Sequence, residues 1–161
     1  MKASIVYHSE SGNTEKLAAI IAEGISGESN IEVRRMGIDS LDEEFITDSK
    51  LVILGCPTYA GSVSWQMKRF TDTVKLKLAG KLGGVFVTEN FVGGGADLAE
   101  LLLIGTMLVR GMVVYSAGTS DGQPFTHYGA VAIKDGDDAQ QQRAKLFGAR
   151  MARKALELFG T

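Results

Sequence analysis

The sequence is poor in the residues that build disulfide and metal frameworks. Its 161 residues include one cysteine, Cys56, and two histidines, His8 and His127. A single cysteine excludes an internal disulfide framework and a thiolate metal cluster, and two histidines alone cannot form a zinc site. We therefore expect no metal. One unpaired cysteine is also typical of a reducing compartment, and we expect a cytoplasmic protein.

The sequence also lacks a strong net charge and a long apolar segment. The formal net charge is −2, so no charge excess draws the chain to nucleic acid or to an anionic membrane. Residues 1–7 are too few for the apolar region of a signal peptide. The most apolar stretch, residues 98–109, is too short to span a bilayer and contains Glu100. We expect neither a nucleic-acid partner nor a membrane partner.

Short apolar runs alternate with longer segments of helical period, which is the pattern of repeated βα units. Strands are predicted at residues 3–8, 31–36, 51–54, 85–87 and 112–115, and helices at 14–25, 64–74, 98–109 and 144–158. Residues 40–45 form at most a short turn, and residues 118–136 form a long loop. The chain then forms one domain, residues 1–161, of the α/β class: three αβα layers around a doubly wound, five-stranded parallel sheet in the order 2-1-3-4-5.

The loop after the first predicted strand is rich in small hydrogen-bonding side chains. Ligands of a doubly wound sheet bind beyond the C-terminal strand ends, and this loop also opens a helix, whose free amides and dipole favour a phosphate. Gly12 lets the backbone approach closely, and no lysine or arginine lies in the loop. A capping turn of the kind common before helices is the alternative. Four side chains supply hydroxyl or amide groups: Ser9, Ser11, Asn13 and Thr14.

The loop after the third predicted strand, residues 55–63, offers a surface for an aromatic ligand. Pro57 removes a donor from the strand ladder and stiffens the exit from the sheet. Tyr59 presents a flat face, and Gly61 permits backbone rearrangement beside a ligand. An ordinary turn with one exposed tyrosine is the alternative.

The loop after the fourth predicted strand contains three successive glycines. They cost backbone entropy, which indicates that something approaches the main chain here; a flexible hinge is the alternative. The candidate residues of this loop are Thr88, Glu89, Asn90, Phe91, Gly93, Gly94 and Gly95.

The Ser-x-Ser-Gly-Asn-Thr run of the first loop resembles the phosphate loop of flavodoxins and related FMN proteins. The resemblance implies a flavodoxin-like fold with FMN as cofactor, in which Glu10 contributes mainly its backbone. The Pro-Thr-Tyr-x-Gly run of the second loop is similar to a region that borders the isoalloxazine ring in flavodoxin-like quinone reductases. The residues so implied are Ser9, Ser11, Gly12, Asn13 and Thr14 for the phosphate, and Pro57, Thr58, Tyr59 and Gly61 for the ring.

The glycine run of the third loop, followed by a leucine-rich helix and then by Arg110-Gly111-Met112, resembles the Wrb-type NAD(P)H:quinone oxidoreductases. Residues 125–130, which end in Tyr-Gly-Ala, are similar to the last active-site loop of that family. The family usually has histidine where this chain has Arg110, and this chain is more compact. The resemblance covers nearly the whole chain in order.

Two functions fit this resemblance. The protein is either an electron carrier between redox partner proteins or an enzyme that takes hydride from NAD(P)H and reduces a quinone or a similar acceptor. The flavin carries the redox chemistry in both cases, so no catalytic side chain is assigned. Glu89, Asp97 and Asp121 are candidates for negative charge near the flavin ring. The apolar face of residues 98–109 is either buried beneath strands or faces a second subunit of a homo-oligomer.

Other proteins with related sheets or phosphate loops fit less well. A receiver domain requires acidic residues directly after the first strand and an acceptor aspartate after the third, where this chain has His8-Ser9 and Gly55-Cys56. A tyrosine phosphatase requires a cysteine in its phosphate loop and a P-loop NTPase a Gly-Lys-Ser/Thr run, and this chain has neither. The intact phosphate loop argues against a flavodoxin-like module without cofactor. Cys56 is predicted to be an inert buried thiol. Trp65 and Met67 either pack in the core or cover the flavin edge.

Overall fold

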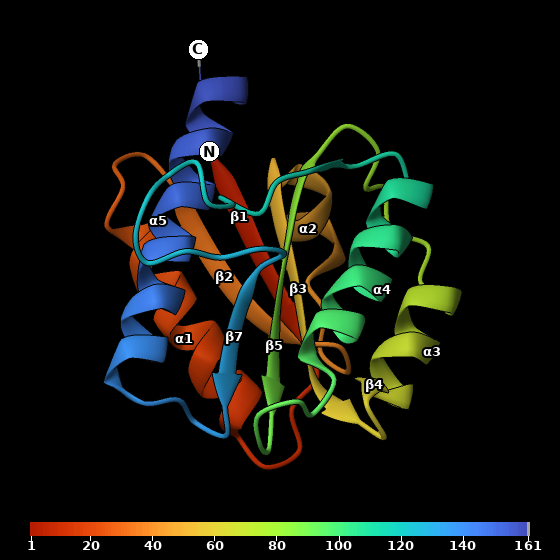
Figure 1. Ribbon diagram of the computed structural model, residues 1–161. Helices are drawn as coiled ribbons and strands as arrows, with labels where there is room; N and C mark the ends of the chain where they lie inside the picture. The colour runs from red at the N-terminus through yellow and green to blue at the C-terminus, as the bar shows by residue number, and fades with distance from the viewer. Residues whose placement is uncertain (161) are drawn as a thin grey trace.

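The computed structural model describes residues 1–160, in which a central sheet carries helices on both faces (Figure 1). The elements and their bounds are β1 (Lys2–Tyr7), α1 (Asn13–Ser26), β2 (Glu32–Gly37), α2 (Glu43–Asp48), β3 (Leu51–Tyr59), β4 (Ser62–Val63), α3 (Trp65–Thr73), β5 (Leu82–Glu89), α4 (Ala96–Val109), β6 (Val113–Val114), β7 (Ala130–Ile133) and α5 (Asp138–Phe159).

The sheet has the predicted doubly wound topology. Its strands run in the order β2-β1-β3-β5-β6, and neighbours along this path are parallel. The order 2-1-3-4-5 is therefore confirmed, because β5 is the fourth strand of the path. β2 forms an edge of the sheet, and its residues alternate imperfectly between exposed and partly buried, as predicted for a half-exposed edge strand.

The fifth position of the sheet differs from the prediction of a single strand at residues 112–115. β6 pairs with the first half of β5 (Leu82 with Val113), and β7 pairs with its second half (Phe86 with Ala130). The chain thus leaves the sheet after β6 and, after fifteen intervening residues, returns as β7 within the segment predicted as a loop. Four apolar residues give no periodic signal of their own, so only the pairing with β5 makes residues 130–133 a strand.

The two faces of the sheet carry two separate cores, which confirms the predicted three-layer arrangement of helices, sheet and helices. Side chains alternate along each strand, so Ile5 of β1 faces α1 and α5, while Val6 faces the layer of α2, α3 and α4. Ile53 and Val52 of β3 divide in the same way. The C-terminal strand ends stay free of helices, and the loops that follow β1, β3 and β5 meet there (Figure 1).

Helix α4 presents an apolar face to solvent. Its residues Ala99, Leu103 and Met107 are buried against the sheet. The apolar face predicted from residues 98–109 lies on the opposite side of the helix and points into solvent. The alternative that this face is buried beneath strands is therefore wrong. Its large side chains are 41–89% exposed: Leu98, Leu101, Leu102, Leu108 and Val109. Within residues 1–160, no helix combines the length and the apolar character that crossing a bilayer requires.

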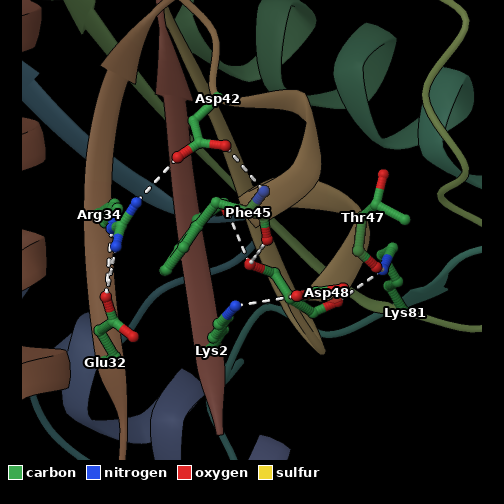
Figure 2. A network of polar contacts seen from close by, with 10 residues as sticks. Lys2, Glu32, Arg34, Asp42, Phe45, Thr47, Asp48 and Lys81 are labelled. Atoms are coloured by element: carbon green, nitrogen blue, oxygen red, sulfur yellow. Dashed lines mark hydrogen bonds and ion pairs between the residues drawn. The ribbon is translucent and has the colours of Figure 1, made fainter.

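Charged side chains of β2 bind the residues at the start of α2 (Figure 2). This helix lies where at most a short turn was predicted. Arg34 donates hydrogen bonds to the carboxylates of Glu32 and Asp42, both at 2.8 Å. Asp42 also caps α2, because its side chain accepts a hydrogen bond from the Phe45 N–H at 2.9 Å. The Arg34 guanidinium lies 4.2 Å from the centre of the Phe45 ring.

Two lysines fasten the other end of α2. Lys2 pairs with Asp48 at 2.8 Å, and the buried Lys81 donates to the carbonyl oxygens of Thr47 and Ser49 (Figure 2). A cation at the C-terminal end of a helix satisfies carbonyl groups that lack helical partners. These contacts hold the end of the sheet opposite to the three loops.

Candidate functional site

Three loops form a cleft at the C-terminal edge of the sheet. They follow β1, β3 and β5, and the cavity between them has a volume of about 260 Å³. The structure therefore brings together residues that lie up to eighty positions apart in the chain. The cleft is lined by Glu10, Ser11, Asn13, Thr14, Pro57, Thr58, Tyr59, Thr88, Glu89 and Asn90.

The first loop presents free backbone amides at the N-terminus of α1. Gly12 precedes the helix with a φ of 88° and, as a glycine, has no side chain with which to cap the helix start. The Ser9 hydroxyl accepts a hydrogen bond from the Glu15 N–H at 3.3 Å. Within the described residues, 1–160, no hydrogen bond has an N–H of residues 11–14 as its donor. Free amides and a helix dipole at one point form an anion site.

A pair of buried hydroxyl groups joins the first loop to the third. The Oγ1 atoms of Thr14 and Thr88 lie 2.8 Å apart, and both residues are buried. One hydroxyl hydrogen is used between the two oxygens, so the other is free to donate elsewhere. The pair fixes the distance between the loops at the floor of the cleft.

The second loop is a tight hairpin between β3 and β4. Tyr59 pairs with Ser62, and the two residues between them, Ala60 and Gly61, have φ values of 50° and 75°. Two successive positive φ values are typical of the type I′ turn that joins antiparallel strands. Burial, followed by a hydrogen bond to Glu10, raises the pKa of the Tyr59 phenol to about 12, so Tyr59 stays a neutral donor at ordinary pH.

The Glu10 side chain is the functional group that the sequence did not reveal. Its carboxylate accepts a hydrogen bond from Gln66 Nε2 of α3 at 2.6 Å, and its charge helps to raise the pKa of the Tyr59 phenol. His8 Nε2 lies 3.8 Å from the same carboxylate. The resemblance implied that Glu10 contributes mainly its backbone. Nothing in the sequence signals this contact, because Gln66 is 56 residues away.

The third loop is built on a close glycine–glycine contact. Gly95 has a φ of 102° and precedes α4, and a Cβ at this position would lie 2.4 Å from the Gly61 backbone. The Glu89 carboxylate accepts a hydrogen bond from the Ala96 N–H at 3.1 Å at the start of the same helix. The expectation that something approaches these glycines is met for Gly95 by the second loop itself, whereas Gly93 faces open space.

This contact makes a prediction for Gly95→Ala. The methyl group would overlap the Gly61 backbone and force alanine into a left-handed conformation, so we expect a loss of about 2 kcal/mol in the free energy of unfolding. Gly93→Ala is the matched control, because Gly93 also has a positive φ but has free space, and should lose about 1 kcal/mol. Urea unfolding measures both. Equal losses would show that the glycine–glycine contact contributes nothing.

The other sequence candidates do not line the cleft, and three of them order the loops around it. Ser9 orders the first loop, and Gly61 and Gly95 join the second loop to the third. Phe91 stands exposed at the rim of the third loop. The candidates that do not line the cleft are Ser9, Gly12, Gly61, Phe91, Gly93, Gly94 and Gly95.

Two groups of candidate residues from the C-terminal third of the chain lie away from the cleft. Residues 125–129 lead into β7, whose first residue pairs with Phe86 in the middle of β5, so they lie before the C-terminal edge and do not line the cleft. Asp121 accepts a hydrogen bond from the Tyr115 hydroxyl at 2.7 Å and lines a separate hollow on α5. The motif at residues 125–130 contains no information about where along the sheet the next strand begins, so its sequence alone could not place it relative to the cleft.

Four further side chains that the sequence singled out lie outside the cleft lining. Trp65 is 62% exposed, so it neither packs in the core nor lines the cleft, whereas Met67 is fully buried. Burial raises the pKa of the Cys56 thiol to about 11, in agreement with an inert buried thiol. Arg110 donates to carbonyl oxygens at the C-terminal end of α3.

The chain matches known proteins along its whole length. The family model described as "Flavodoxin" matches residues 5–97. A protein named flavodoxin from Clostridium saccharobutylicum is 41% identical, and the match covers 99% of this chain and 100% of that protein. A protein named NAD(P)H dehydrogenase (quinone) from Rhizobium johnstonii is 30% identical over 98% of each chain.

A solved structure has the same fold. It is described as the flavodoxin, WrbA-like protein from Agrobacterium tumefaciens, and its TM-score is 0.82 at 23% identity, with 97% of this chain and 98% of that chain covered. The expectation of a flavodoxin-like FMN protein is confirmed at the level of the family by the model match and by the relative at 41% identity. With its free amides beside the first loop and its doubly wound sheet, this chain belongs to the flavodoxin family.

Proposed function

We propose that the chain binds FMN in the cleft and carries electrons between redox partner proteins. The observation that carries this proposal is the set of free amides of residues 11–14 at the N-terminus of α1. Such a site holds a phosphate with neutral donors and a helix dipole, and the cleft lining contains no lysine or arginine. Residues 1–161 would act as a single FMN-binding domain.

The lining residues fit the two ends of FMN. Ser11, Asn13 and Thr14 would donate to the phosphate together with the free amides. Tyr59 would lie against the isoalloxazine ring, with Pro57 and Thr58 beside it and residues 88–90 on the other loop. Bound FMN would supply the redox chemistry, and the chain would bind it, orient it and exclude water from its inner edge.

An NAD(P)H-dependent quinone reductase is the second candidate function. It is favoured by relatives named NAD(P)H dehydrogenase (quinone), one of which is 30% identical over 98% of each chain. Residues 125–129, whose motif suggested this activity, do not line the cleft, and Arg110, which stands where that family usually has histidine, binds carbonyl groups at the end of α3. We therefore rank the carrier first.

The two functions are separated by mixing the FMN-loaded protein anaerobically with NADH and with NADPH in a stopped-flow instrument. For a carrier we expect no rapid bleaching of the flavin absorbance with either nucleotide, but stepwise reduction by dithionite. Rapid bleaching by one nucleotide, followed by reoxidation with a quinone, would favour the reductase. A protein that fails to retain FMN would contradict both.

We also propose a compartment and partners for the protein. A lone, buried Cys56 supports a reducing compartment, and we propose the cytoplasm. The partners we propose are a redox protein or a small quinone, with NAD(P)H as donor in the second case. The exposed apolar face of α4 is the surface on which a homo-oligomer would form.

A further inference from the structure

We propose that His8, in its protonated form, pairs with Glu10 and thereby strengthens the binding of the FMN phosphate. The proposal rests on the proposed function, because it concerns the same cleft. It assigns a role to two side chains next to the phosphate loop.

His8 is a buried side chain with an unpartnered nitrogen. Its backbone N–H donates to the Gly55 carbonyl oxygen at 3.0 Å, which extends the pairing of β1 with β3 by one residue. The residue is 8% exposed, and within residues 1–160 its Nε2 atom has no hydrogen-bond partner. A buried polar atom without a partner costs free energy and calls for an explanation.

The nearest charge to this nitrogen is the Glu10 carboxylate. Nε2 lies 3.8 Å from Glu10 Oε1, which is too long for a hydrogen bond. An approach of roughly 1 Å would produce a charge-assisted hydrogen bond once the imidazole carries a second proton. The Glu10 side chain is 60% exposed, so no packed neighbours block this movement, in which Oε1 would exchange the hydrogen bond from Gln66 for one from His8.

The negative charge of the cleft lining explains how a His8–Glu10 pair would affect phosphate binding. The lining includes the carboxylates of Glu10 and Glu89 and no cationic side chain, although a phosphate brings further negative charge. Lys16, in the first turn of α1, is already paired with Asp135 at 2.9 Å. An imidazolium beside Glu10 cancels one of the two negative charges and so weakens the repulsion of the phosphate.

Two titratable groups close to His8, the Tyr59 phenol and the Cys56 thiol, keep the same charge over the pH range of the proposal. Histidine side chains change charge between about pH 5 and pH 8. In that range the Tyr59 phenol and the Cys56 thiol on β3 remain neutral, because burial raises their pKa values to about 12 and about 11. On the α3 side, Asp39 and Arg69 line a neighbouring hollow with Gln66 and carry opposite charges. Binding of FMN and protonation of His8 should then favour each other.

The test compares the FMN dissociation constant of the wild type and of His8→Gln, measured by quenching of flavin fluorescence at about pH 5.5 and about pH 8.5. We expect the wild-type affinity to fall about tenfold more across this range than the affinity of the variant. The second ionisation of the FMN phosphate, near pH 6, affects both proteins equally and cancels in the comparison. Riboflavin lacks the phosphate and should show no such difference between the two proteins.

Glu10→Gln provides the second variant, since its exposed side chain makes misfolding a minor concern. It should bind FMN more tightly than the wild type at the higher pH and lose most of the pH dependence. Identical pH profiles for the wild type and His8→Gln would overturn the proposal while leaving FMN binding intact. If His8→Gln fails to fold by circular dichroism, an unchanged profile of Glu10→Gln overturns it instead. Absence of FMN binding by the wild type at both pH values would overturn the proposed function itself.

Discussion

Replacing Glu100 by glutamine should stabilise the protein at alkaline pH by up to about 5 kcal/mol, at about 1.4 kcal/mol per pKa unit. Glu100 lies on α4, is 2% exposed, and its Oε1 atom has no partner within residues 1–160. Burial, aided by the charges of Asp97 and Glu89, raises the pKa of this carboxyl from 4.5 to about 8. The native protein thus holds a carboxyl group in an environment that disfavours its charged form.

The sign of the pH effect follows from the two states of the protein. Between pH 4.5 and about 8 the unfolded chain has lost the Glu100 proton while the folded protein keeps it. Raising the pH through this window therefore favours unfolding, and the loss is complete above the folded-state pKa. The wild type should lose stability across the window, and Glu100→Gln should lack this loss.

Urea unfolding of both proteins between about pH 4.5 and about pH 9 measures the effect. The two proteins should be nearly equal at the acidic end and diverge steadily toward the alkaline end. Asp97→Asn should remove only a smaller part of this loss, since Asp97 is exposed one turn earlier on α4 and its charge merely adds to the effect of burial on Glu100. Parallel stability curves for the wild type and Glu100→Gln would show that Glu100 is not held in its neutral form.

Replacing Gly148 by alanine should lower the free energy of unfolding by about 3 kcal/mol, although alanine is the better helix former. The backbones of α1 and α5 touch through two glycines. A Cβ on Gly148 would lie 2.2 Å from the Ile21 carbonyl oxygen, and one on Gly24 would lie 2.0 Å from the Lys145 carbonyl oxygen. The overlaps involve backbone atoms, so the helices would have to separate and disturb the core on that face of the sheet.

Gly105 on α4 is the control for this prediction. A Cβ at Gly105 would have no heavy atom within 4 Å, so Gly105→Ala should stabilise the protein by about 0.5–1 kcal/mol through helix propensity alone. Thermal unfolding followed by circular dichroism measures the three proteins. If Gly148→Ala and Gly105→Ala shift the melting temperature in the same direction, the close approach of α1 and α5 is not what requires glycine at position 148.

The phosphate loop could be predicted from the sequence because its chemistry is local. Gly12 and the polar residues around it follow a buried strand and open a helix, and these neighbours in sequence suffice to create a helix N-terminus with free amides. The sheet order followed from strand periodicity for a related reason, since alternating strands and helices leave few topologies. The positions of Tyr59 and Thr88 at the sheet edge then followed from the direction of parallel strands.

The neighbours of each side chain at the cleft were decided by the tertiary structure alone. The contacts of Glu10 with Gln66 and of Thr14 with Thr88 join residues 56 and 74 positions apart, and no local pattern records such pairs. The same holds for β7, which is a strand only because β5 offers it a partner, and for residues 125–129, whose motif gave no direction of entry. By itself the sequence determined the backbone geometry that binds an anion, because that geometry forms within one turn of helix. Only the folded chain decided which charges surround the anion, because charge interactions depend on distances through space.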